Sequence, residues 1–162
     1  LLATMEGHSG YVRCFAISEK EGAIFSGSDD KQIKKWDLKT GKLLATMEGH
    51  SGSINCLAIS EKEGAIFSGS SDEQIKKWDL KTGELLATME GHSGSINCLA
   101  ISEKECAIFS GSKDKQIKKW DLKTGELLAT MEGHSDWILC LAISEKEGAI
   151  FSGSDDKQIK KW

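Results

Sequence analysis

Short runs of apolar residues alternate with polar turns along the whole chain. "SINCLAIS" (Ser53–Ser60) and "AIFSGS" (Ala65–Ser70) are apolar and partly β-branched, and the glycine-containing "EKEG" between them is typical of a hairpin turn. "SSDE" is a turn by composition, and it is followed by "QIKKWDL", then "KTG", then "LLATME". "LLATME" is too short for a stable helix. The pattern therefore predicts four successive strands.

This four-strand pattern recurs at a fixed interval. "LLATMEGHS" begins at Leu1, Leu43, Leu85 and Leu127, so the period is 42 residues. Repeats of this length stack or radiate because one sheet cannot bury both of its faces alone. The sequence predicts an all-β fold, a β-propeller with four blades per chain. We treat residues 1–162 as one propeller unit with repeats at 1–42, 43–84, 85–126 and 127–162.

Two dipeptides mark each repeat, and their spacing is constant. A Gly-His pair is followed, 28 residues after the histidine, by tryptophan, and in three repeats this is a Trp-Asp pair. The chain thereby resembles the WD-repeat (WD40) family of β-propellers over its whole length. The resemblance implies a non-enzymatic scaffold that binds proteins or peptides. A departure from the family pattern is the lysine before each tryptophan, at Lys35, Lys77, Lys119 and Lys161, which must extend to solvent or find a partner.

A histidine, a serine and an aspartate in each repeat raise the question of a hydrolase triad. Nucleophilic catalysis needs one asymmetric site, and this set occurs four times, so we predict no catalytic residues. The family resemblance implies a structural hydrogen-bonded tetrad instead. The tetrads are His8, Ser26, Asp30 and Trp36; His50, Ser68, Asp72 and Trp78; His92, Ser110, Asp114 and Trp120; His134, Ser152, Asp156 and Trp162. Ser28, Ser70, Ser112 and Ser154 lie on the same strand face and are alternatives for the serine.

Composition excludes several other classes of protein. The 21 Lys and Arg residues and 25 Asp and Glu residues are interleaved, so a nucleic-acid partner is not expected. No apolar run is long enough to cross a bilayer, and we expect a soluble, cytoplasmic protein without membrane contact. The cysteines lack the spacing of a zinc site or a disulfide framework, and no cofactor or metal is predicted. They are Cys14, Cys56, Cys98, Cys106 and Cys140.

The two ends of the chain are complementary in the strand pattern. Leu1–Glu6 reads as an outer strand without a blade of its own, and the last repeat stops at Trp162 before its outer strand. A closed ring of four blades needs about 90° between neighbouring blades, whereas a ring of two chains with four blades each needs about 45°. The second angle is closer to that of the propellers with about seven blades that are usual in the family. We therefore expect two chains to exchange these strands head to tail and close an eight-bladed homodimer. The alternative is a piece of a longer propeller.

The repeats differ at nine of 42 positions, and the differences gather at one rim. Five lie at or just before the first strand and two in the turn between the second and third strands, which emerge on the same side of a meander. Aromatic and arginine side chains on a rigid scaffold are usual interface anchors. The candidate rim residues are Tyr11, Arg13, Lys113, Asp136, Trp137 and Leu139. Neutral drift is the alternative explanation of these differences. The alternative function is a self-assembling building block without further activity.

Overall fold

The chain folds into four antiparallel sheets, so the prediction of an all-β fold is confirmed, and the outer strand of each four-stranded sheet comes from the repeat that follows. The computed structural model describes residues 1–162 and contains fifteen strands, which form three four-stranded sheets and one three-stranded sheet. Blade 1 contains β1 (Val12–Ser18), β2 (Ala23–Ser28), β3 (Ile33–Asp37) and β4 (Leu43–Met47). Blade 2 contains β5 (Ile54–Ser60), β6 (Ala65–Ser70), β7 (Ile75–Asp79) and β8 (Leu85–Met89). Blade 3 contains β9 (Ile96–Ser102), β10 (Ala107–Ser112), β11 (Ile117–Asp121) and β12 (Leu127–Met131). Blade 4 contains β13 (Ile138–Ser144), β14 (Ala149–Ser154) and β15 (Ile159–Lys161).

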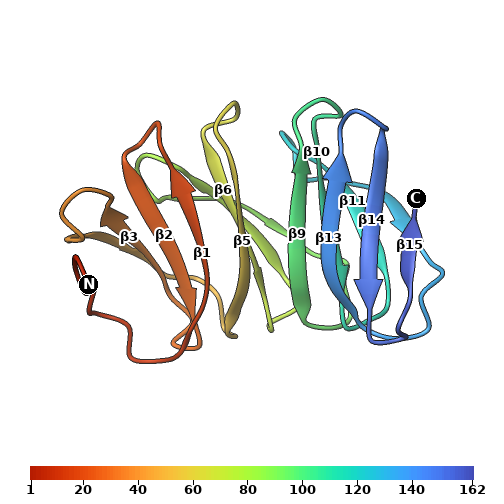
Figure 1. The fold of residues 1–162 in the computed structure, drawn as a ribbon, viewed down its shortest axis with the longest axis horizontal. Coiled ribbons are helices and arrows are strands. Elements are labelled where there is room, and N and C mark those ends of the chain that lie inside the picture. The colour runs from red at the N-terminus through yellow and green to blue at the C-terminus, as the bar shows by residue number, and fades with distance from the viewer.

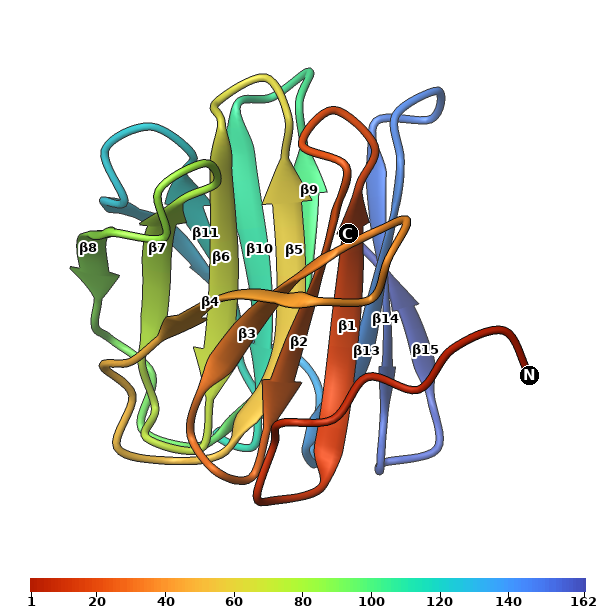
Figure 2. The same ribbon diagram turned by 90° about the vertical axis from the view of Figure 1, so that its left-hand side faces the viewer.

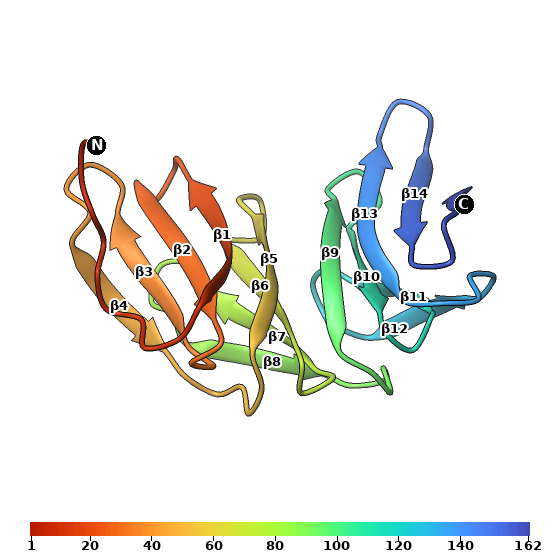
Figure 3. The same cartoon turned by 60° about the horizontal axis from the view of Figure 1, so that its bottom comes forward.

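The four blades form an open arc. Their first strands, β1, β5, β9 and β13, lie side by side, and the two termini lie at opposite ends of the arc (Figure 1, Figure 3). Figure 2 faces blade 1 and shows no sheet in front of it. Residues 1–11 form no strand in the single chain. No helix has the length and hydropathy that crossing a bilayer requires.

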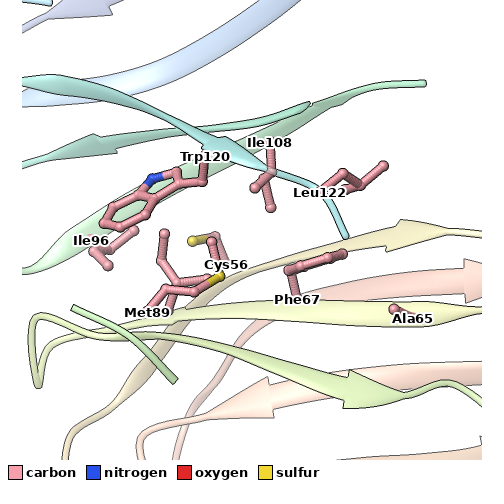
Figure 4. Close-up of a cluster of buried hydrophobic side chains, with 9 residues drawn as sticks. Cys56, Ala65, Phe67, Met89, Ile96, Ile108, Trp120 and Leu122 are labelled. Carbon is pink, nitrogen blue, oxygen red and sulfur yellow. The ribbon is translucent and has the colours of Figure 1, made fainter. Parts of the chain in front are cut away.

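The hydrophobic core lies between the blades. At the junction of blades 2 and 3, Phe67 and Met89 pack against Ile96 and Trp120 (Figure 4). Equivalent residues form the core between blades 1 and 2, and between blades 3 and 4 the partly buried Met131 and Trp162 pack against the cluster that contains Phe109. Fully burying a side chain of this size contributes roughly 1.5–3 kcal/mol, so each junction is a main source of stability. A blade without a neighbour lacks this stabilisation on its open face.

Glycine in the second strand allows the blades to approach closely. A Cβ at Gly69 would lie 2.6 Å from both Cys56 Sγ and Ile96 Cγ2, which is shorter than such contacts tolerate. Cys56 lies in the same blade and Ile96 in the next one. The invariant "SGS" of the second strand is therefore a packing requirement at the junction, in addition to its role in the tetrad.

The lysine before the tryptophan finds acceptors in the next blade. The ammonium groups of Lys35 and Lys77 each donate to two backbone carbonyls at 2.9–3.0 Å. The acceptors are Leu80 and Lys81 for Lys35, and Leu122 and Lys123 for Lys77. Burial lowers the pKa of Lys77, against the opposing effect of nearby carboxylates. The departure from the family pattern thus adds polar links between consecutive blades.

Cys106 occupies a backbone position that the other repeats fill with glycine. Its φ is 50°, and the φ values of Gly22, Gly64 and Gly148 are 59°, 61° and 58°, all in the left-handed region. A non-glycine residue held there costs about 1 kcal/mol. We expect Cys106→Gly to raise the free energy of unfolding by about 1 kcal/mol, as measured by urea titration.

The matched control for this prediction is the reverse change in another blade. Nothing lies within 4 Å of a Cβ built at Gly64, so Gly64→Ala tests the backbone alone. We expect it to lower the free energy of unfolding by a similar amount. Equal stability of Cys106→Gly and the parent chain would contradict the backbone explanation.

Candidate functional site

The candidate tetrad residues of blade 2 form one continuous hydrogen-bonded chain. The indole N–H of Trp78 donates to Ser68 Oγ at 2.8 Å, and Ser68 Oγ lies 2.7 Å from His50 Nε2. His50 Nδ1 lies 2.7 Å from an Asp72 carboxylate oxygen. The carboxylate also accepts from the backbone N–H groups of Ser51 and Gln74. The chain therefore links the segment before the first strand, the second and third strands, and the turn between them.

All four repeats contain the same arrangement, and it selects one of the two serines. The serine is Ser26, Ser68, Ser110 or Ser152, and it lies 2.7 Å from the histidine in every repeat. The alternative serine two residues later has another role. Ser70 Oγ accepts the backbone N–H of Asp72 at 3.1 Å and so shapes the turn.

Neutral histidine satisfies every polar atom of the tetrad. With a proton on Nδ1, His50 donates to Asp72 and accepts the Ser68 hydroxyl on Nε2, which leaves Ser68 Oγ free to accept from Trp78. Burial lowers the pKa of His50 below 6.5, against the opposing effect of Asp72. Burial alone would raise the pKa of Asp72, but its hydrogen bonds, that from His50 foremost, outweigh burial and lower it.

The tetrad geometry resembles a catalytic triad, but the serine of blade 2 is closed to a substrate. Ser68 is fully buried, and its hydroxyl oxygen is already engaged by an indole N–H. The tetrad tryptophans of blades 1 to 3 are buried as well. Each hydrogen-bonded member would leave a buried partner unsatisfied if it moved to take part in chemistry. The arrangement holds the blade together.

The first strands begin, and the turns between the second and third strands lie, along one edge of the arc, the lower edge in Figure 1. In each blade the turn between the second and third strands hydrogen-bonds to the segment that enters the first strand. Asp29 N donates to Tyr11 O in blade 1, and Asp155 N donates to Trp137 O in blade 4. The two variable regions of the sequence are therefore adjacent in space.

Two interactions order the side chains of this rim. Arg13 makes a bidentate ion pair with Asp29, at 2.7 and 2.8 Å. The ammonium of Lys113 in blade 3 lies 4.3 Å from the ring centroid of Trp137 in blade 4. Tyr11 is 82% exposed in blade 1, and Trp137 and Leu139 are 42% and 45% exposed in blade 4. The Asp136 carboxylate accepts the backbone N–H of the adjacent residue, Trp137.

The aspartate after the tryptophan has a structural role that the sequence analysis did not assign. Asp79 accepts the backbone N–H groups of Lys81 and Thr82, at 3.0 and 2.7 Å, and closes the turn into the outer strand. These bonds, that from Thr82 foremost, lower the pKa of Asp79. An aspartate three residues before a threonine, in "DLKTG", is the sequence signal for this turn.

No group of three or more His, Cys, Asp or Glu side chains is placed to hold a metal ion. The repeated four-stranded sheets, the inter-blade core and the tetrads define a β-propeller architecture. Residues 1–37, 41–79, 83–121 and 125–162 each match the family described as "WD domain, G-beta repeat". The chain belongs to the WD40-repeat family.

Solved structures extend the similarity to the whole arc. The computationally designed Ika4 protein is 33% identical, with a TM-score of 0.88 over 100% of this chain and 96% of that one. The WD40 β-propeller domain of Doa1 is 31% identical, with a TM-score of 0.84 over 99% of this chain and 52% of that one. Sequence relatives match over about one repeat. Zinc finger CCCH domain-containing protein 62 of Arabidopsis thaliana is 54% identical over 39 residues, which are 24% of this chain and 9% of that protein.

Proposed function

We propose that this WD40 propeller is a non-enzymatic scaffold that binds a protein or peptide through its variable rim. The observation that carries the proposal is the Trp137 ring, partly exposed and held in place by Lys113 from the neighbouring blade. Aromatic and arginine anchors on a rigid scaffold contribute most of the binding energy in many interfaces. The rim is Tyr11, Arg13, Lys113, Asp136, Trp137 and Leu139.

A structural role for the tetrads supports the non-enzymatic part of the proposal. The Ser-His-Asp sets recur in every blade, and their serines are buried. The five cysteines are unpaired, and three of them have pKa values that burial raises, Cys14 and Cys98 to about 12. Unpaired thiols suit a reducing compartment, so we place the protein in the cytoplasm.

Selection from a phage-displayed library of random peptides on the immobilised chain tests rim binding. We expect peptide binders whose affinity falls about tenfold or more for Trp137→Ala, because an interface anchor is lost. Leu44→Ser is the matched control, since Leu44 is an exposed apolar residue on the outer strand β4. Binders that are indifferent to Trp137, or the failure of any peptide to enrich, would overturn the proposal.

A second candidate function, self-assembly into a closed ring, is supported by the two open ends of the arc. On blade 1, Phe15 is 69% exposed and lines a hollow of about 660 Å³ with Val12, Ile17 and Trp36. On blade 4, Ile159 is 80% exposed, whereas the equivalent Ile75 is 0% exposed. Open apolar faces of this kind are association sites. The natural occupant is a second copy of the chain, because each end matches one half of an internal junction.

The segment before blade 1 already lies where an outer strand belongs. A Cβ at Gly41 would lie 3.1 Å from Met5 Cγ, and a Cβ at Gly83 would lie 3.1 Å from Met47 Cγ. Met47 belongs to β4, the outer strand that precedes blade 2. This matched contact supports the proposal that Leu1–Glu6 takes the place of an outer strand beside blade 1, as β4 does beside blade 2. We propose that β15 of a second chain supplies the third strand with which it pairs.

The curvature of the arc fits a ring of two chains. The likeness to Doa1 supports this candidate, because the four blades superpose on about half of that chain with a TM-score of 0.84. Light scattering tests this candidate directly, and we expect a mass close to twice the 17.7 kDa of one chain. A stable monomer would overturn the assembly and leave rim binding open.

A further inference from the structure

Residues at the variable positions of the repeats are contact points between neighbouring blades. Asn55 donates to the Ile96 carbonyl of the next blade at 2.9 Å, and Asn97 donates to the Ile138 carbonyl at 2.8 Å. These bonds join positions at the start of consecutive first strands. The variation among repeats therefore falls on junctions between blades as well as on the surface.

The turn residue of one blade also meets the residue that immediately precedes the first strand of the next blade. Lys113 lies over the Trp137 ring at 4.3 Å. Asp29 has a lowered pKa, first through its hydrogen bond to Arg13 and further through its polar contact with Ser53 of blade 2. In two internal junctions the variable turn thus contacts the same position of the neighbouring blade.

The equivalent residues at the two ends of the chain are Asp155, in the last turn, and Tyr11, just before β1. Within one chain, neither the Asp155 carboxylate nor the Tyr11 hydroxyl makes a hydrogen bond, and both residues are exposed. Asp29, at the same position in blade 1, is paired with Arg13, but blade 4 has Leu139 at the position of that arginine. The Asp155 carboxylate is therefore free to accept from outside its own blade.

We infer that, in the two-chain ring proposed above, Asp155 accepts a hydrogen bond from Tyr11 of the partner subunit at each closing junction. The inference rests on that assembly and assigns Tyr11 to the contact between chains instead of the ligand-binding rim. A neutral phenol donor facing a carboxylate forms a charge-assisted hydrogen bond. The two ends of the chain thus have a polar pair that differs from the two pairs described inside it.

Lys161 supplies a second contact across the same junction. Lys35 and Lys77 donate to the turn that follows the tryptophan of the next blade. Lys119 faces blade 4, where no such turn is present, and it pairs with Glu105 at 2.6 Å instead. Lys161 at the closing junction then donates to the carbonyls of Leu38 and Lys39 of the partner subunit.

Charge reversal at the proposed pair tests the inference. Tyr11→Asp places two carboxylates together at each closing junction, and we expect the dimer dissociation constant, measured by sedimentation equilibrium, to rise about tenfold or more. Adding Asp155→Lys to Tyr11→Asp restores opposite charges and is expected to recover the dimer. Ser95→Asp is the matched control, because Ser95 precedes the first strand of blade 3 and its neighbouring turn carries Ser71, which has no charge.

A variant of the open apolar face separates failure of this pair from failure of the assembly. Phe15→Asp places a carboxylate in the hydrophobic junction and is expected to give monomers if the ring closes as proposed. Suppose that Phe15→Asp dissociates the dimer. If Tyr11→Asp then dimerises as tightly as Ser95→Asp, or if Asp155→Lys does not restore its dimer, the proposed pair is wrong and the two-chain ring is retained. A monomeric parent chain overturns both.

Discussion

Replacing Ser68 with alanine lowers the free energy of unfolding by about 2–5 kcal/mol. The serine hydroxyl is the shared partner of the Trp78 indole N–H and His50 Nε2, and both groups are buried. Alanine leaves each of them without a partner, and an unsatisfied buried polar group costs about 1–3 kcal/mol. Since small domains have only about 5–15 kcal/mol of stability, one such change removes a large part of it.

Ser70→Ala is the control for this prediction. Ser70 is also fully buried, lies on the same face of β6 and differs by the same hydroxyl group, but it supports only the N–H of Asp72. We expect a loss of about 0.5–1.5 kcal/mol, measured by urea unfolding with tryptophan fluorescence. Equal losses for Ser68→Ala and Ser70→Ala would contradict the assignment of Ser68 to the tetrad.

The strand pattern and the tetrad positions could be predicted because they depend on local signals that occur four times. Alternating apolar runs and turn residues define the strands within one repeat. The choice between Ser68 and Ser70 could not be made, because residues two apart share a strand face. The choice depends on register, since Ile66 pairs with Trp78 and Ser68 pairs with Lys76, which brings Ser68 beside the indole.

Contacts between blades could not be predicted, because they join residues of different repeats that are far apart in the sequence. Lys77 donates to Leu122 and Lys123 of the next blade, and only the radial packing of the sheets brings them together. The ion pair between Arg13 and Asp29 was also not predicted, although it joins two residues of the same repeat. Both residues occur at variable positions of that repeat. Opposite charges at two such positions are a sequence signal from which an ion pair could have been predicted.

Acidification is expected to lower the free energy of unfolding over two separate pH ranges, because folding lowers the pKa of His50 and of eight aspartates. A group whose pKa is lower in the folded state binds more protons when unfolded, so stability falls as the pH falls below its unfolded value. His50 acts first, below about pH 6.5. The aspartates follow below about pH 3.8, and Asp156 reaches a pKa of about 2. They are Asp29, Asp30, Asp37, Asp72, Asp79, Asp114, Asp121 and Asp156.

The two pH ranges can be separated by urea titrations at pH 7.5, 5.0 and 3.0, with tryptophan fluorescence as the readout. We expect a modest fall in the urea midpoint between pH 7.5 and 5.0 and a steep fall below pH 4, where the carboxylates that hold the tetrads and turns lose their charge. Asp72→Asn lacks one of these carboxylates, so its stability is lower at pH 7.5 and depends less on pH below 4. A midpoint that is constant or rises on acidification would show that the tetrad carboxylates are not stabilised by their hydrogen bonds in the folded chain.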